Sequence, residues 1–363
     1  MSMAAGMASM QRALLPVWQD SPLCTSRRFN AEQSPPADLP ADDRRTLARY
    51  AHGSLANLEP IMTIFDPSRT LFADFDQATP VVIFNHSRPH ARAPVFICLP
   101  AMGVAASFYT PFAEALAQAA TGIAVLTDLR GQGQSEALAR RGARFGYQEI
   151  VAEDIPSLIA EIAAQFTGRP IYLVGHSLGG QLGSLAAAHT APGLAGLILV
   201  ASGTAHYRVW PKALRCRAGM AVRAVRIVAA LLPWYPGRLL GFGGDQPRRL
   251  MADWSYNAST GRYRCAGSRI DYEEALNDIV LPVLSVEIRA DPVAPTGATT
   301  ELLAKLASCA IERRQIDGVT ADAPWRRHFS WARSPDEVVA EIVAWVRPQL
   351  RRVNVEYLEP AVV

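Results

Sequence analysis

The sequence has little of what marks several large protein classes. Its 363 residues include five cysteines, whose odd number and scattered positions fit neither a full disulfide framework nor a zinc site. It has no Walker phosphate-binding loop and no dinucleotide-binding glycine fingerprint, so we expect neither a metal nor an organic cofactor. Residues 1–60 contain no apolar run long enough for a signal peptide or a transmembrane segment. We therefore expect a cytoplasmic protein whose thiols stay reduced.

What the sequence does have is a regular alternation of apolar runs and helical patterns. Half of the residues are hydrophobic, which is enough for a large buried core. The alternation predicts an α/β fold, with a mostly parallel central sheet flanked by helices. The predicted strands are 80–85, 94–99, 122–127, 170–174, 195–201, 281–288 and 309–315. The predicted helices are 106–119, 148–166, 178–189, 298–308 and 334–346.

The same patterns divide the chain into five segments. Residues 1–60 are expected to form a flexible N-terminal segment, and residues 351–363 a C-terminal tail. Residues 61–202 and 276–350 carry the two parts of the α/β core. Residues 203–275 interrupt the α/β pattern between two core strands, which is the usual place for a helical lid.

The most informative motif is Gly-x-Ser-x-Gly at residues 175–179. It follows a short apolar run and precedes a helical stretch of small residues, and a nucleophile elbow requires this strand–turn–helix context. In such a turn Ser177 lies in strained backbone at the carboxyl edge of the sheet, and the next helix points free N–H groups at it. The alternative is a glycine-rich turn with a structural serine, and the partners of Ser177 decide between the two.

A catalytic serine needs a histidine that accepts its proton and an acid that orients the histidine. The chain order in this fold is serine, acid, histidine, and only His189, His206 and His328 follow Ser177. His189 lies in the helix that leaves the elbow, and His206 precedes any suitable acid. His328 lies in a loop before the last amphipathic helix and is therefore the predicted general base.

The acid should follow the next core strand, and Asp291 lies in the loop after strand 281–288. A carboxylate there would accept the Nδ1–H of His328 and stabilise the imidazolium. The Asp291-Pro292 pair is also compatible with a simple turn. Other carboxylates are weaker candidates because they precede the strand, lie within it or come late in the chain: Asp278, Glu287, Asp317 and Asp322.

Acyl transfer also requires two backbone N–H donors for the oxyanion. One is expected from Leu178, the residue after the nucleophile. The other should come from the loop after strand 94–99, where counting from the end of the strand selects Met102. A shift of one residue would select Ala101 or Gly103 instead.

With these motifs the chain resembles the α/β-hydrolase superfamily over roughly residues 65–350. Residues 128–135 resemble the superfamily's Asp-x-Arg-Gly-x-Gly-x-Ser loop, with Gln132 in place of the usual histidine. More narrowly, segments 100–104, 130–133 and 235–247 are similar to a group of predicted bacterial serine hydrolases. The resemblance implies the fold and a triad of Ser177, Asp291 and His328, but it hardly constrains the substrate.

Charge is distributed unevenly along the chain. Eleven basic residues stand against two acidic ones between residues 203 and 266, a net charge of +9, whereas the whole chain carries +3. Aromatic residues are interleaved with the basic ones. The simple interpretation is a solvated arginine face on a packed helix. The alternative is a lid whose arginines, among them Arg215, Arg223 and Arg226, attract an anionic amphiphile such as an acyl-CoA or a phospholipid.

We therefore expect a serine hydrolase that cleaves a carboxylic ester or thioester through an acyl-enzyme. A serine nucleophile argues against epoxide and haloalkane hydrolysis, which need a carboxylate at that position in this superfamily. The expected partner is a small or lipid-like acyl substrate and not a nucleic acid. Two alternatives remain open: an acyltransferase in which an alcohol replaces water, and a non-catalytic binding protein on the same fold. The oligomeric state is not indicated.

Overall fold

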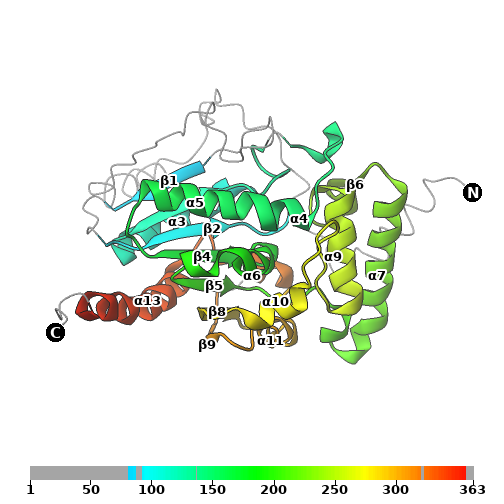
Figure 1. Ribbon diagram of the computed structural model, residues 1–363. Coiled ribbons are helices and arrows are strands. Elements are labelled where there is room, and N and C mark those ends of the chain that lie inside the picture. The colour runs from blue at the N-terminus through cyan, green and yellow to red at the C-terminus, as the bar shows by residue number, and fades with distance from the viewer. Residues whose placement is uncertain (1–80, 87–91, 136, 320–322, 357–363) are drawn as a thin grey trace, which may run out of the picture.

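A seven-stranded sheet forms the centre of the molecule (Figure 1). The computed structural model describes residues 81–86, 92–135, 137–319 and 323–356. The strand order is β1-β3-β2-β4-β5-β8-β9, in which β1 is antiparallel to β3 and all other neighbouring strands are parallel. The strands are β1 (Val81–Asn85), β2 (Val95–Leu99), β3 (Ile123–Thr127), β4 (Ile171–His176), β5 (Gly196–Val200), β8 (Pro282–Ile288) and β9 (Ala310–Ile316). The predicted α/β fold with a mostly parallel sheet is confirmed.

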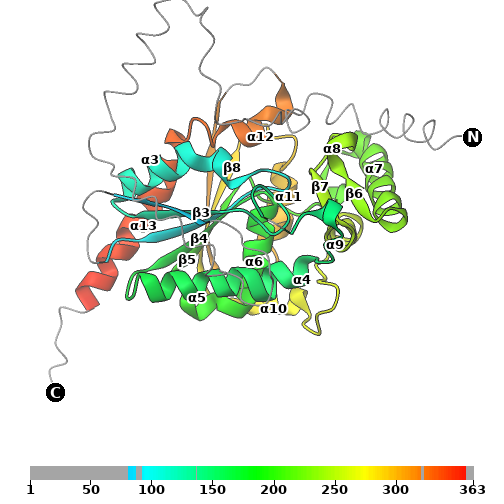
Figure 2. The same ribbon diagram turned by 90° about the horizontal axis from the view of Figure 1, so that it is seen from above.

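Helices cover both faces of the sheet. Figure 2 shows α3 and α13 on one side of the strands and α5, α6 and α10 on the other. The core helices and helical turns are η2 (Ala106–Tyr109), α3 (Thr110–Ala120), α4 (Tyr147–Glu149), the π-helix η4 (Ile150–Asp154), α5 (Ile155–Gln165), α6 (Leu178–Thr190), α10 (Tyr272–Asp278), α11 (Thr296–Leu303), α12 (Arg327–Ser330) and α13 (Asp336–Glu356). Three-residue turns complete the set at η3 (Ala139–Arg141), η5 (Ala191–Gly193), η6 (Tyr207–Val209) and η7 (Pro324–Arg326).

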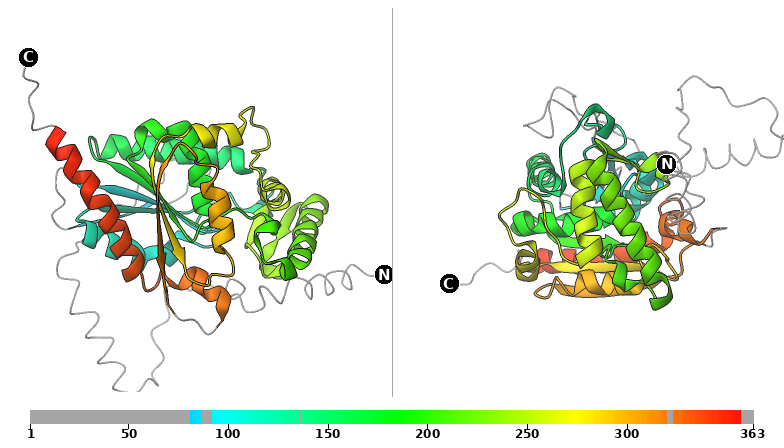
Figure 3. Two further views of the ribbon diagram at one scale, coloured as in Figure 1. Left: turned by 90° about the horizontal axis from the view of Figure 1, so that it is seen from below. Right: turned by 90° about the vertical axis from the view of Figure 1, so that its right-hand side faces the viewer.

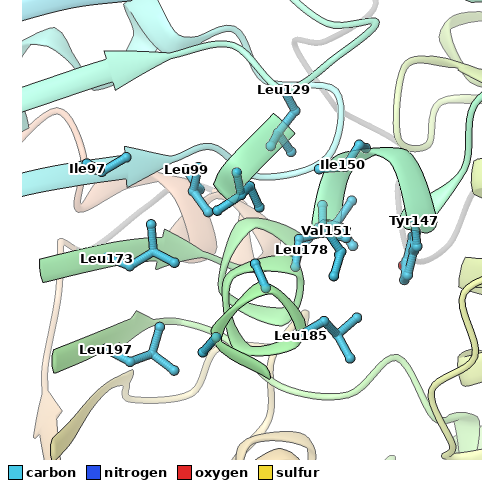
Figure 4. Close-up of a cluster of buried hydrophobic side chains, with 14 of the residues drawn as sticks. Ile97, Leu99, Leu129, Tyr147, Ile150, Val151, Leu173, Leu178, Leu185 and Leu197 are labelled. Carbon is cyan, nitrogen blue, oxygen red and sulfur yellow. The ribbon is translucent and has the colours of Figure 1, made fainter. Parts of the chain in front are cut away.

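The two faces of each central strand enter separate hydrophobic clusters. Along β2, Ile97 and Leu99 join the cluster that also contains residues of α5 and α6, and Figure 4 shows both in this cluster, with Leu99 the nearer of the two to Leu178. Phe96 and Cys98, which alternate with them, join the cluster that contains residues of α3 and α13. Because these strands are buried on both faces, they are continuous apolar runs in the sequence. This is why the predicted limits of β2, β3, β4 and β5 agree with the observed ones to within two residues.

The helix limits agree less well. The predicted helix 148–166 is a succession of α4, η4 and α5, with a π-helical turn in the middle. The predicted helix 298–308 begins at Thr296 and ends at Leu303, because the chain then tightens into i→i+3 bonds such as Lys305 N–H to Leu302 O. The last helix continues past Pro348 to Glu356, so residues 351–356 of the predicted tail are helical. The predicted N-terminal segment 1–60 lies outside the described residues.

Residues 203–275, here called the cap segment, connect β5 to β8 beyond the carboxyl ends of the strands. They contain α7 (Lys212–Leu231), β6 (Trp234–Pro236), α8 (Gly237–Leu240), β7 (Asp245–Pro247) and α9 (Arg248–Thr260). Helices α7 and α9 lie side by side, as Figure 1 and the right panel of Figure 3 show. The expected boundary at 275 falls inside α10, which packs against α6 of the core. Within the described part of the chain, no helix has the length and apolarity needed to cross a membrane.

Candidate active site

Ser177 lies at the turn between β4 and α6, where it is the N-cap residue of α6. Its backbone angles are φ 52° and ψ −116°, in a region that residues with a side chain rarely adopt. Such a conformation persists only where the surrounding structure enforces it, and it is common at functional sites. The side chain is half-buried and lines a cavity.

The glycines on either side of Ser177 explain how this turn forms. A Cβ on Gly175 would collide with the backbone of Gly180, and a Cβ on Gly179 would collide with the carbonyl of Leu99. Glycine at 175 therefore lets β4 and α6 approach each other closely, and glycine at 179 lets α6 approach the end of β2, so that the turn leaves Ser177 at its tip.

Asp291 and His328 meet across 37 residues of sequence. Oδ2 of Asp291 lies 2.6 Å from Nδ1 of His328, and both side chains are buried. Oδ1 of Asp291 accepts hydrogen bonds from the N–H groups of Val293 at 2.8 Å and Ala294 at 3.2 Å, which hold the carboxylate in place. When Nδ1–H donates to Asp291, Nε2 of His328 carries the free lone pair. Nε2 is buried and has no hydrogen-bond partner within the described residues.

The other candidate carboxylates are engaged or exposed. Oδ1 of the exposed Asp317 lies 2.5 Å from Nε of Arg289 at the surface. Glu287 forms an ion pair with an arginine of the edge strand β9. Asp278 is exposed, and Asp322 lies outside the described residues.

The two other histidines that follow the serine also have partners of their own. Nδ1 of His206 lies 2.9 Å from Oε1 of Glu301, and Nε2 of His189 lies 3.0 Å from Oη of Tyr272. Neither histidine lines the cavity beside the serine. The structure therefore places His328, and neither His189 nor His206, at this cavity.

Hydrogen bonds distinguish the three candidate amides of the loop after β2. The N–H of Ala101 donates to Oη of Tyr109 at 3.1 Å, and the N–H of Gly103 donates to Oε1 of Gln132 at 2.6 Å. The N–H of Met102, between them, has no partner within the described residues, and Met102 lines the cavity. Leu178 lines it too, and its N–H has no acceptor among the described residues because Leu178 is the first residue of α6.

The residues that hold this loop come from distant parts of the chain. Gln132 belongs to the Asp-x-Arg-Gly-x-Gly-x-Ser loop and is buried. In the same loop, Oδ1 of Asp128 accepts from the N–H of Ala106 at 2.6 Å, and Oδ2 accepts from the N–H of Gln134 at 2.8 Å. The loop after β3 is thus bonded to the segment after β2 at two points, Gly103 and Ala106.

His176, which precedes the serine, packs against His328 with a ring separation of 4.7 Å. Its Nδ1 lies 2.6 Å from Oη of Tyr109, the same hydroxyl that accepts from Ala101. Burial lowers the pKa of His176 well below its ordinary value, and the neighbouring His328 adds to this effect. His176 is therefore uncharged at neutral pH, and Tyr109 donates its hydroxyl proton to Nδ1.

A cavity of about 100 Å³ opens between Ser177, His328 and the cap segment. Its wall is mostly apolar, and the large side chains in it are Met102, Trp210, Phe242, Trp254, Trp325 and Phe329. None of the described residues that line it is an aspartate, glutamate, lysine or arginine. Such a cavity suits an uncharged, apolar group.

The expected lid arginines are not part of this wall. Arg215 donates from Nε to the carbonyl of Trp210 at 3.0 Å. Arg215 therefore contacts Trp210, which lines the cavity, but does not line the cavity itself. Arg223 and Arg226 are exposed on α7. None of these three arginines lines the cavity. The geometry therefore does not support the prediction that they attract an anionic substrate at Ser177.

The contacts of several site residues cannot be read from the sequence. Tyr109, His176 and Gln132 act through contacts with segments 29 or more residues away, apart from the Tyr109–Ala101 bond. Trp325 and Phe329 lie close to His328 in the sequence, so the sequence places them near the site. It does not show that their side chains point into the cavity.

Fold and site together define a hydrolase of the α/β type. The profile of the family described as serine aminopeptidase, S33, matches residues 89–320, which is more than half of the chain. The chain therefore belongs to this α/β-hydrolase family, and the resemblance that its motifs indicated is confirmed.

Solved structures that resemble the chain include a monoacylglycerol lipase from Paleococcus ferrophilus, at 18% identity and a TM-score of 0.49, covering 74% of this chain and 97% of that one. Est1E from Butyrivibrio proteoclasticus, solved with ferulic acid, has 16% identity and a TM-score of 0.49, covering 76% and 97%. The enol-lactonase from Burkholderia xenovorans has 19% identity and a TM-score of 0.46, covering 74% and 96%. These values bear on neither reaction nor substrate. A comparison with curated proteins finds no match.

Proposed function

We propose that this α/β-hydrolase is a serine hydrolase that cleaves a carboxylic ester or thioester through an acyl-enzyme. One observation carries the proposal. The buried hydrogen bond of 2.6 Å between Asp291 and His328 leaves Nε2 of His328 without a partner, in the cavity that Ser177 lines. A base held by a carboxylate, at a cavity that a serine also lines, is the arrangement that activates a hydroxyl for attack.

In the first half of the reaction, Ser177 attacks the acyl carbon. As the Oγ–C bond forms, the hydroxyl proton passes to Nε2 of His328, and Asp291 stabilises the imidazolium. The negative charge on the former carbonyl oxygen is held by the N–H groups of Met102 and Leu178. When the tetrahedral intermediate collapses, the bond to the alcohol or thiol breaks, and that leaving group takes the proton from His328.

In the second half, water replaces the leaving group. His328 accepts a proton from the water while the water oxygen bonds to the acyl carbon. The same two amides hold the oxyanion, and the bond from the acyl carbon to Oγ of Ser177 then breaks. Oγ regains the proton, and the carboxylic acid leaves. The uncharged His176 lies against His328 throughout and so does not repel the imidazolium when it forms.

The cavity indicates the kind of acyl group. Its modest volume, about 100 Å³, and its aromatic wall favour a short or flat, uncharged acyl chain. The family's description names an aminopeptidase, whose substrate carries an α-ammonium group close to the scissile bond. A carboxylate in the wall would be needed to bind that cation, and none of the described lining residues has one. The cavity therefore favours an ester or thioester over an amino-terminal peptide.

The test uses the full chain, a fluorophosphonate probe and p-nitrophenyl esters of increasing acyl length. Wild-type protein should label covalently and hydrolyse the short esters fastest. Ser177→Ala should fold but lose labelling, and its kcat should fall by about 10⁴-fold or more. Ser107→Ala, which removes an exposed hydroxyl from η2, is the matched control and should behave as wild type. Full turnover by folded Ser177→Ala would refute the proposal, and so would a wild-type protein that neither labels nor turns over.

A further inference from the structure

A second cavity, of about 210 Å³, lies between α7 and α9 of the cap segment. It shares no lining residue with the cavity beside Ser177. Three of its lining residues are arginines, one from α7, one from the start of α9 and one from the loop after α9. The full lining is Arg226, Ala229, Ala230, Arg248, Ala252, Tyr256 and Arg264.

Helical spacing explains how the sequence builds this groove. Arg226 and Ala230 are four residues apart on α7, and Arg248, Ala252 and Tyr256 follow one another at intervals of four on α9. Residues at this spacing lie on the same face of a helix, so each helix presents arginine and alanine to the groove. The alanines are too small to fill the space between the helices, and the groove stays open above them.

The three arginines of the groove form no side-chain ion pair within the described residues. No carboxylate there forms an ion pair with Arg226, Arg248 or Arg264, although other arginines of the chain, such as Arg249 with Glu149 at 2.7 Å, are paired. Arg248 is also the first residue of α9, where the helix dipole disfavours a cation. Like charges around one groove repel one another, and a bound anion would relieve both effects.

The Asp253 carboxylate acts on Arg264 electrostatically, but its hydrogen bonds go to backbone groups outside the groove. Its side chain is 1% exposed, and its two oxygens accept from the N–H groups of Tyr147 and Ala266 at 3.0 Å each. Arg264 in turn is held over the ring of Tyr256, with its guanidinium carbon 4.2 Å from the ring centre. This contact orients the guanidinium before any ligand arrives, which lowers the entropic cost of binding.

We propose that this groove binds the phosphate group of an anionic ligand. Guanidinium groups present N–H donors in a planar fork that matches phosphate oxygens, and several of them can share one phosphate. Because the arginines are exposed, water screens their attraction for a singly charged carboxylate, and such a ligand should bind weakly. A phosphate ester or diphosphate carries more than one negative charge and should bind more tightly. The phosphate belongs either to a soluble ester or to a lipid headgroup. The proposal does not rest on the reaction at Ser177.

The test measures binding of inorganic pyrophosphate to the full chain by calorimetry at constant ionic strength. Saturable binding at one site per chain is expected, with acetate far weaker. Arg226→Gln and Arg248→Gln should each weaken pyrophosphate binding by about tenfold or more, because each removes charge-assisted hydrogen bonds. Arg223→Gln is the matched control: it removes an exposed arginine one turn earlier on α7, outside the groove, and should leave binding unchanged.

Vesicles separate the two sources of phosphate. Sedimentation with phosphatidylcholine vesicles that contain phosphatidic acid, reversed by pyrophosphate and lost in Arg226→Gln, would identify a lipid headgroup. Pyrophosphate binding without sedimentation would identify a soluble phosphate ester. Ester hydrolysis and Tm confirm that each variant is folded, since no substituted arginine lines the Ser177 cavity. The proposal is overturned by the absence of saturable pyrophosphate binding, or by equal weakening in Arg223→Gln and Arg226→Gln.

Discussion

The side-chain carbonyl of Gln132 accepts a hydrogen bond of 2.6 Å from the backbone N–H of Gly103. With the Tyr109–Ala101 bond on the other side, it leaves the N–H of Met102, alone among the three candidate amides, without a partner within the described residues. Gln132 thus takes a positioning role at the place where related loops carry histidine. The loop after β3 thereby sets the direction of an amide in the loop after β2.

Replacing Gln132 tests this relationship. Gln132→Met keeps the size of the side chain but removes the acceptor for Gly103 N–H. The loop after β2 should then shift, and the N–H of Met102 should no longer point at the oxyanion. We expect kcat for a p-nitrophenyl ester to fall by roughly 10- to 100-fold with little change in KM, because loss of a whole oxyanion donor costs about 10²–10³. Gln134→Met, an exposed neighbour, serves as control. A KM effect without a kcat effect would contradict the positioning role.

Asp291 and Asp317 offer a matched pair of substitutions. Asp291→Asn removes the charge that orients and stabilises His328, and kcat should fall by about 10⁴. Asp317→Asn removes only the exposed contact with Arg289 and should leave kcat unchanged. Stopped assays with the same ester, with circular dichroism as a check on folding, measure both. The acid is misassigned if the Asp317 variant is the inactive one.

The aromatic wall should limit the length of the acyl chain. Trp254 lines the cavity and packs against Phe242 with ring centres 5.0 Å apart. Trp254→Ala should enlarge the cavity and raise kcat/KM for an octanoyl ester relative to an acetyl ester by roughly tenfold, since about two added CH₂ contacts are worth that much. Tyr256→Ala, on the same helix but outside this cavity, should not change the ratio. An unchanged ratio in Trp254→Ala would show that the acyl chain lies elsewhere.

The buried His176 predicts the sign of a pH effect on stability. Its pKa is well below the ordinary value in the folded chain, so between neutral pH and the folded pKa only the unfolded chain takes up a proton. This contribution to stability is therefore complete above the ordinary pKa of about 6.5 and is lost as pH falls, at up to about 1.4 kcal/mol per pH unit. Denaturant titrations of wild type and His176→Gln between pH 7.5 and 5.5 measure it. The variant should show the shallower slope, and equal slopes would contradict the assignment.

The sequence by itself determined the elements whose cause is local. Strands such as β2, β3 and β5 are buried on both faces, so their apolar runs are continuous and their limits are readable. The turn at Ser177 is equally local, because glycine at 175 and 179 is required by atoms within the same strand–turn–helix unit and the neighbouring strand. Helix ends were less certain. Pro348 suggests an end, yet α13 continues past it to Glu356.

Only the tertiary structure decided which side chains meet. The sequence favoured Asp291 as the partner of His328 over Asp278, Glu287, Asp317 and Asp322, but only the folded chain brings Oδ2 of Asp291 to 2.6 Å from Nδ1 of His328. Nothing in the sequence indicated that Gln132 bonds to the loop after β2, or that Arg226, lying far along the chain from Arg248, would share a groove with it. Periodicity reports which face of an element is buried. It does not report which distant element covers that face, because that choice is made by the packing of the whole chain.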